Sequence, residues 1–362
     1  MTFEELMDFA VTTDCSDVHI TVGTNLAVRR NGVLEILDCC PTMEEAEGMI
    51  FTILSEEDIA YVKSGHDLDI GVMIDNGLRI RANIYHQRNN LAASIRLLMS
   101  EIPSFEQLML PMAIKDLAEA KRGLVLVTGP TGSGKSTTLA AVVDYINHNY
   151  ARHVITIEDP IEYLYPHNYA MIHQREIGRD VKDFATALRS SLREDPDIIL
   201  VGEMRDFETI SAAITAAETG HLVLSTLHTT SAAQTIERII DASPLESQEQ
   251  IRAQFANCLR GVISQQLLPL QDGTGRIVAT EVMVANSAIQ NLIRENKTIQ
   301  IPASIMAGKR EGMHSLNEDL IRLVHEGKIS RKVALTASYD PVDLDKNIGS
   351  SSFSNQQFAF VE

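Results

Sequence analysis

The chain has 362 residues, 44% of them hydrophobic, and this length predicts two domains, or one domain with a substantial appendage. Its 49 acidic and 31 basic residues give a net charge of −18, which disfavours DNA or RNA as a partner because nucleic-acid-binding proteins usually carry a basic surface. The sequence has neither an apolar run of about 18 residues nor a basic-then-apolar N-terminus, so we expect a cytoplasmic protein with no membrane span and no signal peptide.

The four cysteines are Cys15, Cys39, Cys40 and Cys258, and no two of them form a C-x-x-C pair. A structural zinc site usually needs two such pairs or a matching histidine spacing. We therefore expect reduced, structural thiols, as in most cytosolic proteins.

Residues 1–99 have the pattern of a compact α+β domain. Thr2 and Glu5 form a capping-box motif before a helix that has one apolar face, made of Phe3, Leu6, Met7 and Ala10. Strand-like runs flank two Asn-Gly pairs, which is a strong hairpin signal. The pairs are Asn31-Gly32, between residues 28–30 and 33–36, and Asn76-Gly77, between residues 68–74 and 78–85.

Apolar and polar residues alternate over residues 79–84, as they do in a half-buried strand. The apolar positions Ile80, Ala82 and Ile84 are expected to face a core. The intervening positions must then face outward, and these are Arg79, Arg81 and Asn83.

Residues 100–112 contain two prolines and are predicted to form a linker or hinge. From residue 113 strands alternate with helices, which predicts an α/β domain with a mainly parallel, three-layer sheet. Its strand-like runs are 124–127, 154–157, 198–201 and 222–226, and its helical runs include 184–192 and 209–217. The pattern after residue 280 is helical. Residues 336–362 are predicted to be a disordered tail, because the chain from Lys346 to Glu362 is rich in Ser, Asn and Gln.

The most informative motif follows the run at 124–127. It reads G-x-x-x-x-G-K-S from Gly129 to Ser136 and leads into a helix. Glycines let backbone N–H groups point at phosphate oxygens, and the helix dipole favours the same anion. We expect Lys135 to contact the β- and γ-phosphates and Ser136 to hold Mg²⁺, so the predicted ligands are ATP and Mg²⁺. The predicted nucleotide-contacting residues here are Gly129, Pro130, Thr131, Gly132, Ser133, Gly134, Lys135, Ser136 and Thr137.

Hydrolysis also needs carboxylates that organise Mg²⁺ and orient the attacking water. Glu158, Asp159 and Glu162 follow one apolar strand, and Glu203 follows another, in the order expected after a phosphate loop. A single acid at a strand end is more often a helix cap or a solvated residue. Two such segments after a phosphate loop favour a catalytic site.

Two histidines, His221 and His228, flank a further strand-like run. A lone histidine near a strand is more often a structural hydrogen-bonding group, and a zinc site would need more ligands. The alternative is a histidine that senses the γ-phosphate or braces a carboxylate.

Residues 158–162, 192–206 and 219–229 resemble the Asp box, the Walker B motif and the His box of the secretion ATPases. These ATPases are the hexameric motors of type II secretion and type IV pili. The resemblance covers roughly residues 1–335. It implies a RecA-like domain at residues 113–335, including C-terminal helices, and a smaller PAS-like domain at residues 1–99.

The resemblance also implies a homohexamer in which ATP lies between the two domains. Glu162 resembles the general base for water, and Glu203 resembles the acid that acts on the Mg²⁺ shell, through water. The positions of His221 and His228 resemble those that couple the nucleotide to domain movement, with His221 placed among the nucleotide-binding residues.

Two arginines of the first domain, Arg81 and Arg96, match a pair that approaches the phosphates in this family as the interface closes. An arginine supplied in trans stabilises developing charge. The alternative is two solvated strand arginines, because long basic side chains usually face water.

The chain begins at the smaller domain and has no four-cysteine insert, a combination that matches the retraction branch, the PilT-type twitching-motility ATPases. Residues 288–295 resemble a motif of that branch, with Gln290 where arginine is usual, and residues 311–320 resemble a later helix. The implied function is ATP hydrolysis that drives pilus retraction. The implied location is the inner face of the cytoplasmic membrane, on the pilus base and its platform protein, without insertion into the bilayer.

Three alternatives stay open. One is an assembly, secretion or competence-pseudopilus ATPase of the same superfamily. Another is a regulatory protein that binds ATP and turns it over slowly, which intact Lys135, Glu162 and Glu203 disfavour. A nucleic-acid translocase is the third, disfavoured by the net charge.

Overall fold

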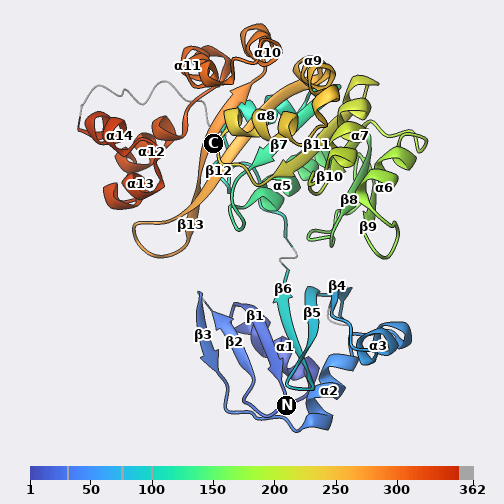
Figure 1. The fold of residues 1–362 in the computed structure, drawn as a ribbon. Coiled ribbons are helices and arrows are strands. Elements are labelled where there is room, and N and C mark those ends of the chain that lie inside the picture. The colour runs from blue at the N-terminus through green and yellow to red at the C-terminus, as the bar shows by residue number, and fades with distance from the viewer. Residues whose placement is uncertain (31, 75–76, 99–100, 350–362) are drawn as a thin grey trace. The chain divides into compact units, whose positions relative to one another are not determined.

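The computed structural model describes residues 1–30, 32–74, 77–98 and 101–349, and the chain divides into two compact units (Figure 1). Unit 1 contains Met1–Glu101 together with Pro160–Leu164, and unit 2 contains Ile102–Asp159 and the chain from Tyr165 onward. Each unit has its own sheet and its own hydrophobic core. No helix within the described ranges combines the length and the apolar character that crossing a membrane requires.

The sheet of unit 1 is antiparallel, with the strand order β3-β2-β1-β6-β5-β4. Helix α1 begins at the predicted capping box of Thr2 and Glu5 and buries the predicted apolar face. Both predicted hairpins are present, although Asn31 and Asn76 of their turns lie outside the described residues. The elements are α1 Phe3–Thr12, β1 Cys15–Thr21, β2 Ala27–Arg30, β3 Val33–Ile36, α2 Met43–Phe51, α3 Glu56–Lys63, β4 Leu68–Met73, β5 Arg79–Gln87 and β6 Asn90–Leu97.

The predicted alternation along β5 is confirmed. Ile80, Ala82 and Ile84 are fully buried in the core of unit 1. The alternating positions, which include Arg81, are half-buried or exposed. The outer face of this sheet therefore carries the polar side chains of β5.

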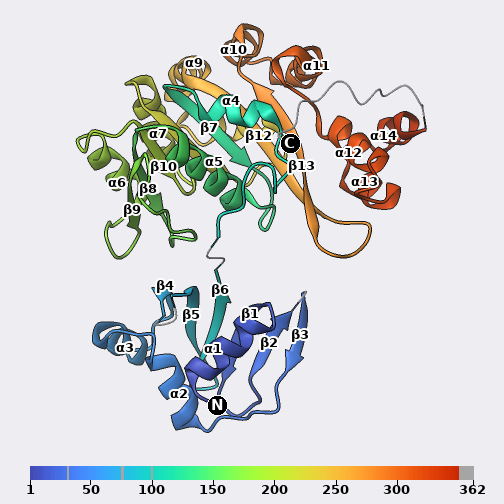
Figure 2. The same ribbon diagram turned by 180° about the vertical axis from the view of Figure 1, so that it is seen from behind.

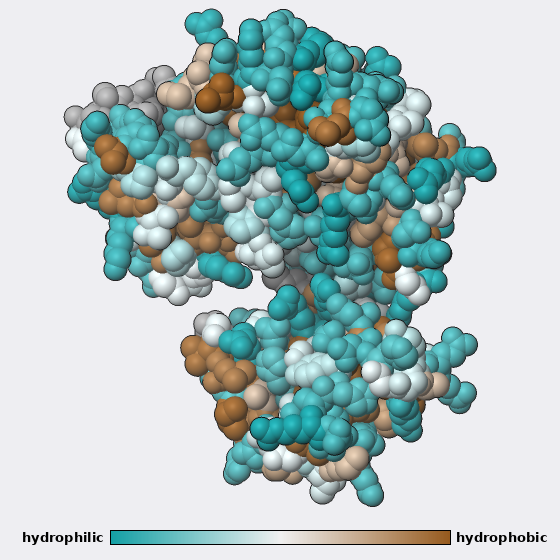
Figure 3. Space-filling model, viewed as in Figure 1, coloured by the Kyte–Doolittle hydropathy of each residue, from teal (hydrophilic) through white to brown (hydrophobic). Residues whose placement is uncertain are grey.

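The edge strand β3 leaves apolar side chains uncovered within the described part of the chain. Val33, Leu34 and Ile36 are each about half exposed or more. The hydrophobic colour gathers over β3 in unit 1, on a surface that is otherwise mainly hydrophilic (Figure 3). The sheet of unit 1 thus has an apolar edge at β3.

The sheet of unit 2 has the strand order β13-β12-β7-β11-β10-β8-β9, in which β13 is antiparallel and the others are parallel. Helices α7, α8 and α9 cover one face and α4 and α5 the other, so the predicted three-layer arrangement is confirmed (Figures 1 and 2). The elements are α4 Met112–Ala118, β7 Gly123–Thr128, α5 Lys135–Asn149, β8 His153–Glu158, β9 Met171–Glu176, α6 Phe184–Ser191, β10 Ile198–Val201, α7 Phe207–Glu218, β11 Leu222–Leu227, α8 Ala232–Asp241, α9 Gln248–Cys258, β12 Leu259–Pro269 and β13 Arg276–Val284.

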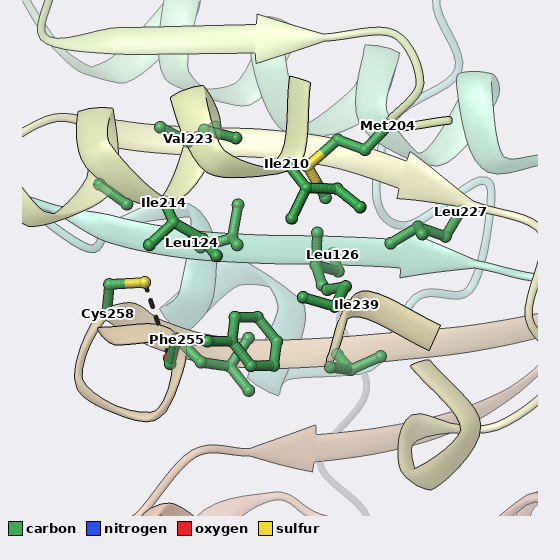
Figure 4. Close-up of a cluster of buried hydrophobic side chains, with 14 of the residues drawn as sticks. Leu124, Leu126, Met204, Ile210, Ile214, Val223, Leu227, Ile239, Phe255 and Cys258 are labelled. Atoms are coloured by element: carbon green, nitrogen blue, oxygen red, sulfur yellow. Dashed lines mark hydrogen bonds between the residues drawn. The ribbon is translucent and has the colours of Figure 1, made fainter. Parts of the chain in front are cut away.

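The core of unit 2 fixes the strands that end at the candidate site. Leu124 and Leu126 of β7 pack with side chains of β11, α7, α8 and α9, including the fully buried Phe255 (Figure 4). Strands β7, β10 and β11 are buried over their whole length, which explains why their sequences are mainly apolar and carry no charged residue. Their carboxyl ends are therefore held in fixed positions relative to one another.

All four cysteines are free thiols, as expected. Cys258, at the end of α9, is buried in this core, and burial raises the pKa of its thiol to about 12. Cys15 is buried in unit 1, whereas Cys40 is exposed. At least Cys15 and Cys258 therefore act as small apolar side chains.

The C-terminal part of the segment predicted as a linker, residues 100–112, packs on unit 2 through a few buried side chains. The division between the units falls after Glu101, and Ile102 already belongs to unit 2. Phe105 and Leu110 are buried, and helix α4 begins at Met112. The extent of the linker stays a prediction, with Phe105, Leu110 and α4 belonging to unit 2.

The helical pattern predicted after residue 280 is confirmed from residue 287 onward, whereas residues 281–284 still belong to strand β13. The α-helices of this region are α10 Ser287–Arg294, α11 Ile301–Ala307, α12 Leu316–His325, α13 Arg331–Ala337 and α14 Pro341–Ile348. The prediction of a disordered tail over 336–362 is wrong for α14. Asp340 caps this helix, Leu344 is fully buried against α12, and Asp345 pairs with Arg331. The composition of this region did not reveal that Leu344 and Ile348 pack against the cluster that includes α12. Residues 350–362 lie outside the described residues.

A buried polar cluster joins α12 to β13. His314 is 1% exposed, and its Nε2 lies 2.9 Å from the Thr280 hydroxyl oxygen. Asp319 accepts a hydrogen bond from the Thr280 backbone N–H. Burial lowers the pKa of His314, and this effect outweighs the opposing charges of Asp319 and Glu318. The folded protein therefore resists protonation at His314.

Acidification should for this reason destabilise unit 2. The unfolded chain takes up a proton near pH 6.5 that folded His314 resists, so stability falls as the pH drops below about 6.5. His314→Gln should flatten the dependence of Tm on pH between about pH 7 and pH 5. His325→Gln, at an exposed histidine of α12, is the control and should keep the wild-type dependence. A His314→Gln profile parallel to that of the wild type would contradict this assignment.

Candidate nucleotide site

The phosphate-loop motif lies between β7 and α5, as predicted. Strand β7 ends at Thr128 and the 15-residue helix α5 begins at Lys135. Gly132 and Gly134 have left-handed backbones, with φ of +77° and +87°. At Gly129 a Cβ atom would lie 2.3 Å from the carbonyl oxygen of Gln265. These positions require glycine, and the loop directs the N-terminus of α5 outward as an anion-binding end.

Lys135 is held over this loop. Its Nζ donates to the carbonyl oxygens of Gly129, at 2.9 Å, and Pro130, at 3.1 Å, and its side chain is largely buried. The same Nζ lies 3.5 Å from Nδ1 of His228. The loop thus carries a fixed positive charge where a triphosphate would place its terminal phosphates.

A carboxylate and an imidazole complete a line of polar groups that starts at Lys135. Glu203 Oε1 lies 3.1 Å from His228 Nε2, and Glu203 Oε2 accepts a hydrogen bond from Arg205 at 2.7 Å. A neutral His228 that carries its proton on Nε2 satisfies both contacts, since Nδ1 then accepts from Lys135. Strands β7, β11 and β10 are parallel neighbours, and their carboxyl ends bring these groups together.

The acids after β8 have different surroundings. Glu158 Oε1 accepts hydrogen bonds from the Thr156 hydroxyl at 2.7 Å and the Gln174 amide at 3.2 Å. Asp159 is exposed. Glu162 is half-buried and belongs to the segment Pro160–Leu164, which groups with unit 1. The geometry of unit 2 by itself therefore assembles Lys135, His228 and Glu203, and the role of Glu162 stays a prediction.

Arg81 and Arg96 lie directly opposite each other on β5 and β6 of unit 1. Arg81 makes two hydrogen bonds to Asp69, at 3.1 and 2.6 Å, and Arg96 donates to Asp17 at 3.0 Å. Two like charges at facing strand positions repel each other, and the flanking acids offset this repulsion. The outer face of the sheet thus presents two arginines that are each held by one carboxylate.

The oxygen donors at the loop fit Mg²⁺. Ser136 is exposed at the start of α5, and Glu203 provides a carboxylate at the same end of the sheet. Mg²⁺ prefers such oxygen ligands and usually keeps waters and substrate phosphates in its shell. Across the ranges that the structure covers, no three His, Cys, Asp or Glu side chains are arranged to hold a metal alone. The donors present therefore suit an ion that arrives with a nucleotide.

Comparison with known proteins places the chain in a family. Residues 2–273 match the model of the family described as "Type II/IV secretion system protein". The chain belongs to this family. It is 42% identical to the type IV pilus retraction ATPase PilT of Pseudomonas aeruginosa over 92% of this chain and 97% of that protein. It is 45% identical to a twitching motility protein of Neisseria gonorrhoeae over 80% of this chain and 78% of that protein.

A solved structure of the pilus retraction motor PilT with bound ADP has a similar fold. Its TM-score against this chain is 0.89 at 45% sequence identity, and the match covers 96% of this chain and 99% of that one. The expected fold, an N-terminal domain before a RecA-like ATPase domain, is confirmed for this family member.

His221 does not belong to the phosphate site of its own chain, in contrast to the prediction. It precedes β11, whereas His228 follows it, and the six residues between them span roughly 20 Å of strand. Leu222 pairs with Gly123, at the end of β7 that lies away from the phosphate loop. His221 Nδ1 lies 3.0 Å from the Ala216 carbonyl oxygen. Here it is a structural hydrogen-bonding group.

Two polar residues of β12 lie at the loop and were not predicted from the sequence. Ser264 accepts a hydrogen bond from Thr128, and Gln265 donates to the Ser133 carbonyl oxygen. The available signal was the polar run Ser264-Gln265-Gln266 between the apolar residues Val262-Ile263 and Leu267-Leu268. In this secretion-family protein, β12 thus contributes to the site although it lies about 130 residues after the loop.

Proposed function

We propose that this chain is an ATPase motor that hydrolyses ATP, with Mg²⁺, to drive type IV pilus retraction and twitching motility. The observation that carries this proposal is the line from Lys135 through His228 to Glu203 at the phosphate loop. Such a line connects a phosphate-binding cation to a carboxylate that can organise the metal shell. The similarity over most of the chain to retraction ATPases supports the same reading.

In the proposed reaction Lys135 and the loop N–H groups bind the β- and γ-phosphates. Ser136 would be a direct ligand of Mg²⁺, and Glu203 would act on its shell through water. Bound Mg²⁺ would neutralise charge on the phosphates. Glu162 would take a proton from the attacking water. His228, which contacts both Lys135 and Glu203, would transmit the presence or absence of the γ-phosphate to the Glu203 carboxylate. His221 is not part of this proposal.

The proposed assembly is a homohexamer in which Arg81 and Arg96 stabilise developing phosphate charge from unit 1. Each arginine is bound to one aspartate, so contact with a phosphate would exchange a carboxylate for a more highly charged partner. The hinge would lie in the segment of residues 100–112, at its N-terminal part, because the division between the units falls after Glu101. Opening and closing around the ring would be transmitted to an inner-membrane platform protein at the pilus base, with the motor at the cytoplasmic face of the membrane.

Replacing Arg81 with alanine should lower kcat about tenfold to a hundredfold and change the affinity for ATP less than about twofold. The reason is that the proposed contact is made with charge that develops during the reaction. Phosphate release and calorimetric ATP binding measure the two quantities. Arg30→Ala, at an arginine of the same sheet paired with Glu35, is the control and should keep wild-type turnover. Equal losses of binding and turnover in Arg81→Ala would argue against charge stabilisation.

Deletion of the gene tests the biological task. If the protein is a retraction motor, cells that lack it should carry abundant pili that do not retract. Electron microscopy would show the pili, and the cells would not twitch. Complementation with the wild-type gene should restore twitching. Cells without pili would instead identify an assembly motor of the same family, and normally piliated, twitching cells would favour a secretion or competence task.

A further inference from the structure

Gln265 lies directly beneath the phosphate loop. Strand β12 pairs with β7, where Ser264 stands opposite Thr128, and Gln265 is the next residue. Its side chain is 2% exposed, and its Nε2 donates to the carbonyl oxygen of Ser133 at 2.7 Å. A residue from a distant part of the sequence thus forms the floor of the loop.

The loop touches Gln265 at three successive places. At Gly129 a Cβ atom would meet the Gln265 carbonyl oxygen at 2.3 Å, and at Gly134 it would meet Gln265 Nε2 at 3.3 Å. Between these glycines lies the hydrogen bond to Ser133. The contact at Gly129 involves the backbone of residue 265, whereas the contacts at Ser133 and Gly134 involve the Gln265 side chain, so this side chain limits movement of the Ser133–Gly134 peptide toward β12.

The hydrogen bond to Ser133 also sets the direction of a neighbouring N–H group. In a planar trans peptide the C=O and the following N–H point in opposite directions. Because the Ser133 carbonyl points at Gln265, the N–H of Gly134 points away from β12. That is the outer side of the loop, where the N-terminus of α5 attracts an anion.

Packing does not explain why the residue beneath the loop, Gln265, is polar. Gln265 Oε1 and Ser133 Oγ are both buried, and neither has a hydrogen-bond partner among the described residues. Buried polar atoms without partners are rare and unfavourable, so an apolar side chain of equal size would pack better here. The carboxamide therefore needs a role that an apolar residue would not perform.

We infer that Gln265 is a positioning residue of the nucleotide site. It holds the Ser133–Gly134 peptide in the orientation that presents a backbone N–H to the phosphates. This inference rests on the proposed function, since it requires that a nucleotide binds at this loop. Gln265 acts through the loop backbone and not by contact with the reacting atoms.

Gln265→Met is the sharpest test, because methionine keeps the length of the side chain and removes its donor. The variant should bind ADP and ATP about five- to tenfold more weakly by calorimetry, as expected for one lost hydrogen bond that orients the loop. KM for ATP should rise by a similar factor, with kcat within about twofold, because the lost contact serves substrate and transition state equally.

Gln266→Met is the matched control. Gln266 is the next residue of β12 and faces the opposite side, where it donates to Ala337 and Tyr339. It should keep wild-type affinity even where its Tm falls. If Gln265→Met does not fold, Gln265→Glu keeps the shape, replaces the donor by an acceptor facing the Ser133 carbonyl, and should weaken binding further.

The outcomes separate the inference from the proposed function. A wild-type protein that neither binds nor hydrolyses ATP would overturn the proposed function. An active wild type with unchanged Kd and KM in Gln265→Met would overturn the inference alone. A loss of affinity shared equally by Gln265→Met and Gln266→Met would also overturn it, since it would reflect general destabilisation of β12.

Discussion

Replacing Lys135 with alanine should abolish measurable ATP hydrolysis and weaken ATP binding by at least about a hundredfold. Lys135 places a largely buried ammonium at the phosphate loop, where its Nζ donates to the carbonyl oxygens of Gly129 and Pro130 and lies 3.5 Å from Nδ1 of His228. Its bonds to phosphate oxygens would be charge-assisted and therefore strong. Phosphate release and calorimetric titration with ATP measure the two effects.

Lys115→Ala is the matched control for this experiment. The Lys115 ammonium lies 4.8 Å from the centre of the Tyr145 ring in the same unit, so the substitution removes an equal charge away from the loop. Its turnover should stay within about twofold of wild type. Turnover of Lys135→Ala within tenfold of wild type would mean that the loop is not the hydrolytic site. Tm values of both variants show whether a loss of activity reflects unfolding.

The site residues that the sequence predicted correctly as neighbours lie just after the carboxyl ends of strands. Lys135, His228 and Glu203 each follow a mainly apolar strand without charged residues, and such strands belong in the middle of a parallel sheet. Their carboxyl ends all lie along one edge. Local pattern and one topological rule were therefore enough to place these three groups together.

The errors and omissions have a common physical origin in long-range packing. His221 and His228 flank the same strand, and a motif that names both does not say which end faces the loop. Gln265 reaches the site because β12 pairs with β7, and the order of strands in a sheet is not encoded by local periodicity. Helix α14 is stabilised because Leu344 is buried against α12. Amino-acid composition does not reveal such a contact.

Glu162 differs from these residues because it lies in the segment Pro160–Leu164, which groups with unit 1, and its role as general base stays a prediction. Glu162→Gln should lower kcat by about a hundredfold to a thousandfold and leave ATP affinity within about twofold, because an amide keeps the size of the side chain and does not accept a proton from water. Single-turnover hydrolysis and calorimetric ATP binding measure these quantities. Glu194→Gln, at a glutamate paired with Arg175, controls for the loss of one negative charge and should be fully active.

The result for Glu162→Gln also bears on the neighbouring acids, because one of them could be the base instead. Turnover of Glu162→Gln within about threefold of wild type would assign the base to another carboxylate, and Glu158 and Asp159 are the nearest along the chain. Glu158 is a weaker candidate, because its Oε1 already accepts hydrogen bonds from Thr156 and Gln174 that hold it to β8 and β9. A base must present an oxygen to water in the reacting geometry. A large loss in Glu162→Gln with intact binding would therefore mean that catalysis requires the segment Pro160–Leu164, which groups with unit 1, as well as the phosphate loop of unit 2.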